Sequence, residues 1–129
     1  MDVDEKKIAL DLQSISMTMD QQFDFKLPTR LLFGCDYLNH LGDLMAEYGG
    51  RRVLLVTDAH VESAGHTARA VSSLEGAGLE VFIFDNIDEN PTSHHVDQAT
   101  AFAHTKDIDC IVGIGGGSVI DAAKGVNFL

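Results

Sequence analysis

The chain has 129 residues, of which 45% are hydrophobic, and its formal net charge is −11. This length and composition suit one globular domain that buries about two-thirds of the surface its unfolded chain would expose. The negative charge, with a sequence pI near 4.6, argues against a nucleic-acid-binding surface and against docking on anionic lipid. A phosphate-bearing ligand stays compatible with it, because backbone N–H groups bind phosphate without any Lys or Arg.

Cysteine content and the N-terminal segment indicate an intracellular setting. Cys35 and Cys110 form no disulfide framework, and both are expected to be reduced packing residues. No apolar run approaches the roughly 20 residues of a membrane-spanning helix. Residues 1–22 have neither the apolar centre of a signal peptide nor an arginine, so a cytoplasmic protein is expected. We expect these polar residues to form a flexible leader before a domain at residues 23–129.

From residue 23 the hydrophobic pattern predicts alternating strands and helices. Phe23, Phe25 and Leu27 alternate with polar residues, and an extended stretch then resumes after Pro28 and runs to Gly34, which predicts a β-hairpin. Further along, helical spacing covers residues 37–48, 64–74 and 96–103, and apolar runs of strand length cover residues 53–56, 79–84 and 108–114.

The core strands are apolar on both faces and alternate with helices. This arrangement predicts an α/β fold, a Rossmann-like parallel sheet with helices on both faces, preceded by the hairpin. Ligands of open parallel sheets bind outside the carboxyl ends of the strands. Three such ends carry suggestive residues, namely Thr57 with Asp58, residues 85–92, and residues 113–118.

The strongest motif is a run of three glycines, Gly115, Gly116 and Gly117, followed by Ser118 at a predicted helix start. It is not the Rossmann fingerprint, because this chain has Ser118 where the fingerprint has its third glycine. It is not a Walker loop either, because no Gly-Lys-Ser/Thr follows. A loop without side chains at a helix N-terminus predicts anion binding by backbone amides. The alternative is a tight turn packed closely on the sheet, although each ordered glycine loses about 1 kcal/mol of backbone entropy.

Asp58 follows a predicted strand and has two possible roles. Its carboxylate can accept hydrogen bonds from a ribose diol and repel a 2′-phosphate, which would favour NAD over NADP. It can instead act as the N-cap of a helix that begins near His60.

Other polar residues near the predicted site also allow more than one role. Ser118 and Asp121 have the spacing of a capping box, which can coexist with a ligand role. Asn90 belongs to a turn whose Thr92 is a candidate N-cap, and its amide can bond to a ribose or phosphate. The six histidines make no convincing metal site and are expected to lie on the solvated surface.

Taken in order along the chain, these motifs resemble the N-terminal, dinucleotide-binding half of the iron-containing (group III) alcohol dehydrogenases. This superfamily also includes glycerol dehydrogenases and dehydroquinate synthases. The matching segments are Leu-Pro-Thr-Arg-Leu-Leu-Phe-Gly at 27–34, Val-Thr-Asp at 56–58, Asn-Pro-Thr at 90–92, and Gly-Gly-Gly-Ser-Val-Ile-Asp-Ala-Ala-Lys at 115–124. The resemblance implies that the glycines and Ser118 hold the NAD pyrophosphate. The full set of cofactor-binding residues that it implies is Asp58, Asn90, Gly115, Gly116, Gly117, Ser118 and Asp121.

The same resemblance implies an activity, hydride transfer between an alcohol and NAD that yields an aldehyde or ketone. A divalent iron or zinc ion would polarise the alcohol oxygen. The family's metal ligands belong to a following helical domain that is absent here, so neither a catalytic residue nor a metal ligand is expected in residues 1–129. Glu89 also stands where a proline is common in the family.

We therefore expect a fragment or one part of a split protein, inactive alone, that forms a homo-oligomer or associates with a missing helical domain. Two alternatives remain: a dehydroquinate synthase-like cyclase, or a non-catalytic nucleotide-binding or interaction module from a truncated gene.

Overall fold

The computed structural model describes residues 26, 28–88 and 90–129. The predicted leader and, apart from Lys26, the first strand of the predicted hairpin lie outside the described residues. The chain divides into two units, Met1–Leu32 and Phe33–Leu129, and the fold described next is that of the second unit.

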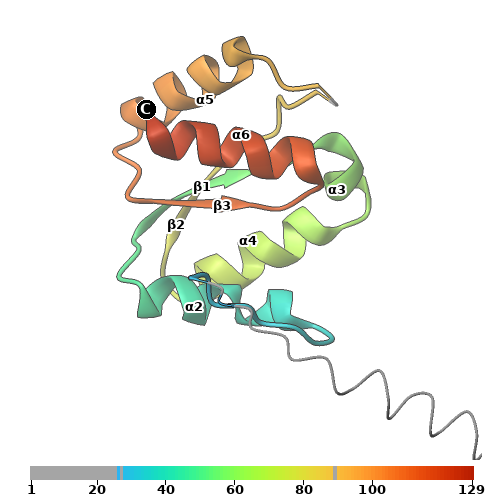
Figure 1. The fold of residues 1–129 in the computed structure, drawn as a ribbon. Helices are drawn as coiled ribbons and strands as arrows, with labels where there is room; N and C mark the ends of the chain where they lie inside the picture. The colour runs from blue at the N-terminus through green and yellow to red at the C-terminus, as the bar shows by residue number, and fades with distance from the viewer. Residues whose placement is uncertain (1–25, 27, 89) are drawn as a thin grey trace, which may run out of the picture. The chain divides into compact units, whose positions relative to one another are not determined.

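Helices and strands alternate along the second unit (Figure 1). In chain order they are η1 (Tyr37–His40, a 3₁₀ helix), α2 (Leu41–Glu47), β1 (Arg52–Val56), α3 (Ala59–Ser63), α4 (His66–Gly76), β2 (Glu80–Phe84), α5 (Ser93–Thr105), β3 (Cys110–Gly113) and α6 (Gly117–Phe128). α3 and α4 are separate helices because Gly65 between them has a left-handed φ of 81°. No helix of the described part of the chain is both long enough and apolar enough to cross a membrane.

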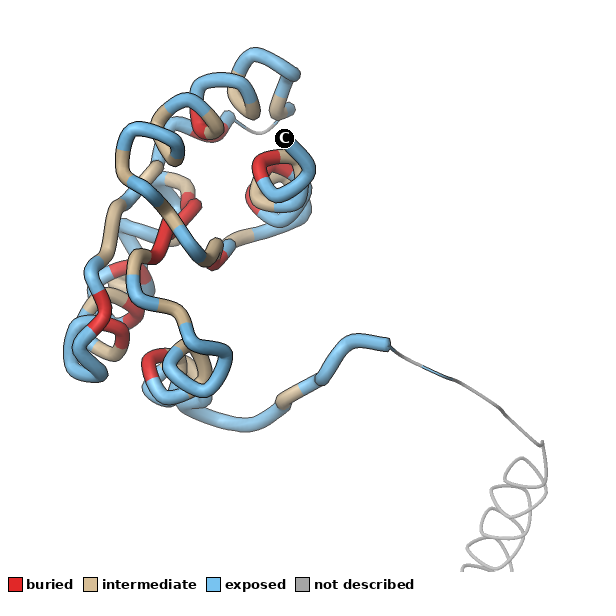
Figure 2. The backbone as a smooth tube through the Cα atoms, turned by 90° about the vertical axis from the view of Figure 1, so that its left-hand side faces the viewer, coloured by how far each residue is buried: buried red, intermediate tan, exposed pale blue. Residues whose placement is uncertain are grey.

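The strands form a parallel sheet in the order β2-β1-β3. Side chains of the central strand alternate between its faces. Leu54 and Val56 pack with α5 and α6, whereas Val53 and Leu55 pack with α2 and α4. All four are fully buried, and Figure 2 shows the buried positions in red along the strands and the adjoining helix faces. The predicted parallel sheet with helices on both faces is confirmed.

Two glycines bring neighbouring helices close to one another. A Cβ on Gly42 of α2 would stand 2.0 Å from the carbonyl oxygen of Ser73 in α4. A Cβ on Gly125 of α6 would stand 2.9 Å from Cγ1 of Val96 in α5. These close approaches make each helical layer a tightly packed support for the sheet edge.

The second strand of the predicted hairpin is not present. Residues 28–36 contain no strand, and the chain turns at residues 34–36 before η1. Pro28 lacks the N–H that a regular ladder needs.

Candidate functional site

Thr57 ties together the carboxyl ends of the three strands. It is fully buried. Its backbone N–H donates to the Phe84 carbonyl at 3.0 Å, and its Oγ1 donates to the Ile114 carbonyl at 3.1 Å. Ile114 in turn donates its N–H to the Val56 carbonyl at 2.9 Å. The three loops that leave this edge therefore start from a fixed frame.

A cavity of about 290 Å³ lies at this edge of the sheet. Its walls are residues 58–60 after β1, residues 87–88 after β2, and residues 116–118 at the start of α6. The structure thus brings together the three strand ends that the sequence singled out. Neither Lys nor Arg occurs among the lining residues, so the donors available to an anion there are backbone amides together with the Ser118 hydroxyl and the His60 ring.

The three consecutive glycines differ in what surrounds them. A Cβ on Gly115 would stand 2.6 Å from Val119 Cγ2 and 3.1 Å from Asp58 Oδ2, so close packing explains this glycine. A Cβ on Gly116 or Gly117 would meet no atom within 4 Å. Neither residue has a positive φ. Packing therefore accounts for Gly115, whereas neither packing nor backbone conformation accounts for Gly116 and Gly117, which line the cavity.

The first turn of α6 faces the cavity without a side-chain cap. The helix begins at Gly117, and its N-cap Gly116 makes no side-chain hydrogen bond. The predicted capping box is wrong, because Ser118 lies one residue inside the helix rather than at the N-cap position. Asp121 is exposed and does not line the cavity. The helix therefore presents its partial positive charge and backbone amides at the cavity wall.

Asp58 takes the capping role and also lies at the cavity. Its Oδ1 accepts hydrogen bonds from the backbone N–H groups of His60 and Val61, each at 2.9 Å, so it is the N-cap of α3. It also lines the cavity beside the glycine run. One carboxylate oxygen is used in capping, and a carboxylate has further acceptor capacity.

The loop after β2 contributes differently from expectation. Asn90 is exposed and does not line the cavity, whereas Asp88 does. Asp88 was missed, although it lies in the loop whose position at a strand end marked it for attention. Thr92 is the N-cap of α5, as predicted, and its backbone N–H donates to His95 Nδ1 at 3.1 Å. The prediction that the histidines lie on the solvated surface is wrong for His95, whose side chain is only 14% exposed.

His60 also lines the cavity and was not predicted as a site residue. Its position two residues after Asp58, in the first turn of α3, is the sequence signal that could have identified it. Within residues 26, 28–88 and 90–129, no group of three or more His, Cys, Asp or Glu side chains is arranged to hold a metal ion.

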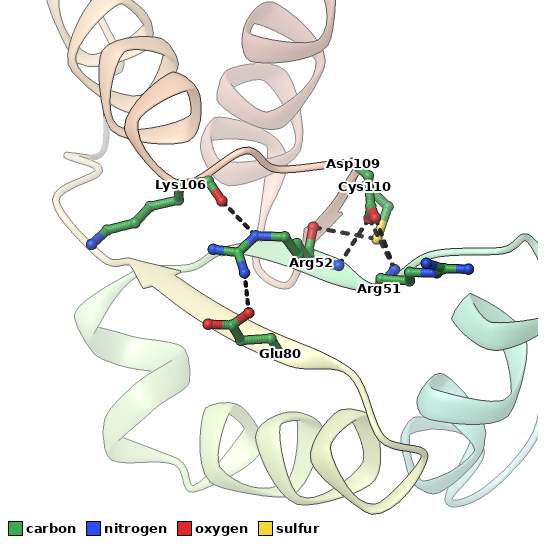
Figure 3. A network of polar contacts seen from close by, with 6 residues as sticks. All are labelled: Arg51, Arg52, Glu80, Lys106, Asp109 and Cys110. Atoms are coloured by element: carbon green, nitrogen blue, oxygen red, sulfur yellow. Dashed lines mark hydrogen bonds and ion pairs between the residues drawn. The ribbon is translucent and has the colours of Figure 1, made fainter.

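A second polar network lies at the amino ends of the strands, away from the cavity (Figure 3). Asp109 accepts hydrogen bonds from the backbone N–H groups of Arg51 and Arg52 at 3.0–3.1 Å. These bonds, that from Arg51 foremost, lower the pKa of the Asp109 carboxyl. The Arg52 side chain donates to the Lys106 carbonyl at 2.7 Å and pairs with Glu80. The polar groups of this network bond to one another, so we infer that the network stabilises the fold rather than binding a ligand.

The cysteines have different environments. Burial, followed by the neighbouring Asp109, raises the pKa of the Cys110 thiol to about 12, so this residue stays protonated at neutral pH. A Cβ on Gly50 would stand 2.7 Å from its Sγ, which fits a packing role. Cys35 is free and exposed, so the packing role expected for it is wrong.

Comparisons with known proteins agree with this geometry. The family model for iron-containing alcohol dehydrogenase matches residues 28–129. The chain is 31% identical to choline dehydrogenase of Bacillus subtilis, covering 84% of this chain and 27% of that protein. It is also 33% identical to 1,3-propanediol dehydrogenase of Klebsiella pneumoniae, and that match covers 82% of this chain and 28% of the Klebsiella protein.

A solved structure shows the same likeness in three dimensions. NADH-dependent butanol dehydrogenase A of Thermotoga maritima superposes with a TM-score of 0.75 at 30% identity, over 81% of this chain and 27% of that one. The chain thus spans about a quarter of the length of these relatives. Because the family model covers most of the described residues, the chain belongs to the iron-containing alcohol dehydrogenase family.

Proposed function

We propose that the cavity at the strand ends binds the diphosphate of NAD, and that the chain is the cofactor-binding part of an NAD-dependent alcohol dehydrogenase. The observation that carries this proposal is the glycine pair Gly116 and Gly117. Among the residues that the structure describes, no atom lies within 4 Å of a Cβ built on either glycine, and neither needs a positive φ. A ligand that approaches the backbone closely explains both glycines, and the uncapped start of α6 suits an anion.

The start of α6 and Asp58 then each have a role towards the cofactor. The backbone amides at the start of α6, including that of Ser118, would bind the diphosphate oxygens. Asp58 would accept from the adenosine ribose hydroxyls and repel a 2′-phosphate, which favours NAD over NADP. When bound, NAD supplies the hydride acceptor for an alcohol carbon. Asn90 and Asp121 remain predicted contacts to parts of the cofactor beyond this cavity.

The names of two relatives support this cofactor and substrate class. The butanol dehydrogenase of Thermotoga maritima is NADH-dependent, and the Klebsiella relative acts on 1,3-propanediol. We therefore propose a small alcohol, or the corresponding aldehyde, as the substrate of the whole protein. A cytoplasmic location and a homo-oligomeric state stay predictions.

The metal that the family name implies does not fit the described residues, which offer no suitable set of ligands. We expect the ligands of such a metal outside the described residues. We accordingly expect residues 1–129 to bind NAD without oxidising alcohol. A non-catalytic nucleotide-binding module is the second candidate, favoured by the same lack of a ligand set in the described part of the chain.

Titration of NAD into the full chain by isothermal calorimetry tests the proposal. The variant Gly116→Val places a branched side chain in the cavity and should abolish saturable binding. Gly76→Val is the matched control, because Gly76 also faces open space but lies at the end of α4. Binding that survives Gly116→Val, or an absence of binding by the unmodified chain, would refute the cofactor site. Measurable alcohol oxidation by the unmodified chain would refute the expectation of inactivity.

A further inference from the structure

His95 connects the loop after β2 to the first turn of α5. Its Nδ1 accepts a hydrogen bond from the backbone N–H of Thr92 at 3.1 Å, and its Nε2 lies 3.2 Å from Asp88 Oδ2. A backbone N–H can only donate, so Nδ1 must be the unprotonated nitrogen and Nε2 carries the proton. Nε2–H therefore donates to the Asp88 carboxylate. One imidazole thus holds the loop at two points.

The held carboxylate belongs to the cavity wall. Asp88 lines the cavity together with Gly116 and Gly117. Its neighbour Ile87 is buried in the core at 7% exposure, which fixes the backbone of the loop. The Asp88 side chain itself is 78% exposed. Its position is therefore determined mainly by the contact with His95 rather than by packing.

A carboxylate in this position matters because the proposed ligand is an anion. Like charges repel one another, and no Lys or Arg lines the cavity to offset the charge of Asp88. The hydrogen bond from His95 draws the Asp88 carboxylate to α5. Without that bond, the side chain is free to sample positions beside the glycines, where the diphosphate would lie.

We propose that His95 is a positioning residue for the cofactor site, which sets the affinity for NAD by holding the Asp88 carboxylate away from the diphosphate. This inference rests on the proposed NAD site. It assigns a role to a residue that contacts the cavity only through Asp88.

The chain offers variants that separate this role from a purely structural one. His95→Asn keeps an acceptor near the position of Nδ1, which preserves the cap on Thr92, but cannot reach Asp88 as the imidazole does. The adjacent His94 is exposed, does not line the cavity, and serves as the matched control. Asp88→Asn removes the repulsive charge at an exposed side chain and leaves the fold intact.

The test is NAD titration by calorimetry of the full chain, with thermal melting of each variant. His95→Asn should raise the Kd by about 3-fold to 10-fold, the range expected for one hydrogen bond, with little change in melting temperature. His94→Asn should leave the Kd unchanged. Asp88→Asn should bind at least as tightly as the unmodified chain, and adding His95→Asn to it should have no further effect.

Several outcomes would overturn the inference. They are an unchanged Kd for His95→Asn, weaker binding by Asp88→Asn, or an equal loss on adding His95→Asn to Asp88→Asn. If the unmodified chain binds NAD and Gly116→Val does not, such outcomes refute the role of His95 alone. If the unmodified chain does not bind NAD, both the site and the role of His95 are refuted.

Discussion

The glycine run allows one prediction that separates packing from ligand binding. Gly115→Ala places a Cβ 2.6 Å and 2.7 Å from two side-chain atoms of Val119, and 3.1 Å from Asp58 Oδ2. Val119 is 1% exposed and belongs to the core, so it has no room to withdraw. Overpacking of this kind costs about 1–3 kcal/mol.

Gly117→Ala should behave in the opposite way. The added Cβ meets no atom within 4 Å, and Gly117 is the first residue of α6. Alanine there restricts the unfolded chain and should stabilise the fold by about 0.4–1 kcal/mol. The same methyl group enters the cavity, so NAD should bind more weakly.

Thermal melting monitored by circular dichroism tests the predicted effects on stability, and NAD titration of the same samples tests the predicted effects on affinity. At about 4 °C per kcal/mol for a domain of this size, Gly115→Ala should lower the melting temperature by about 4–12 °C and Gly117→Ala should raise it by about 2–4 °C. Equal destabilisation by the two variants would refute the distinction between them. Unchanged NAD affinity in Gly117→Ala would contradict the ligand contact.

Three further predictions follow from single contacts. Asp58→Asn keeps an N-cap for α3 and removes the charge, so the preference for NAD over NADP should fall by roughly tenfold with little loss of stability; an unchanged ratio of the two Kd values would count against the ribose role. Thr57→Val removes the donor to the partly buried Ile114 carbonyl and should cost about 1–3 kcal/mol in urea unfolding, whereas Thr57→Ser should cost less, and equal costs would show that the hydroxyl is unimportant. The lowered pKa of Asp109 means that its stabilisation is present above the unfolded pKa of about 3.9 and is lost as the pH falls through the folded pKa. The stability difference between the unmodified chain and Asp109→Asn should therefore shrink below about pH 4, and a difference that stays constant from pH 6 to pH 3 would contradict this cause.

The predictable parts of this chain are those encoded by local pattern. Strands β1, β2 and β3 are continuous apolar runs between turn residues, and their alternation with helical spacing identified the parallel sheet. Asp58 and the glycine run were found because strand ends and helix starts are readable from neighbouring residues. Their convergence in one cavity followed from the general geometry of parallel sheets.

Contacts that depend on tertiary position were not predictable. Nothing local indicates that Asp88 and His95 meet, because their contact depends on the path of the intervening loop. The capping box at Ser118 had the right spacing, but α6 begins at Gly117, which leaves Ser118 inside the helix. Only coordinates distinguish Gly115, whose space is filled by Val119, from the two glycines after it.

Backbone amide chemical-shift mapping of the 129-residue chain during NAD titration tests the central claim most directly. The largest, saturable shifts should fall on the amides of residues 116–119 and on Asp58. Shifts confined to other surfaces, such as the amino ends of the strands around Asp109, would contradict the account.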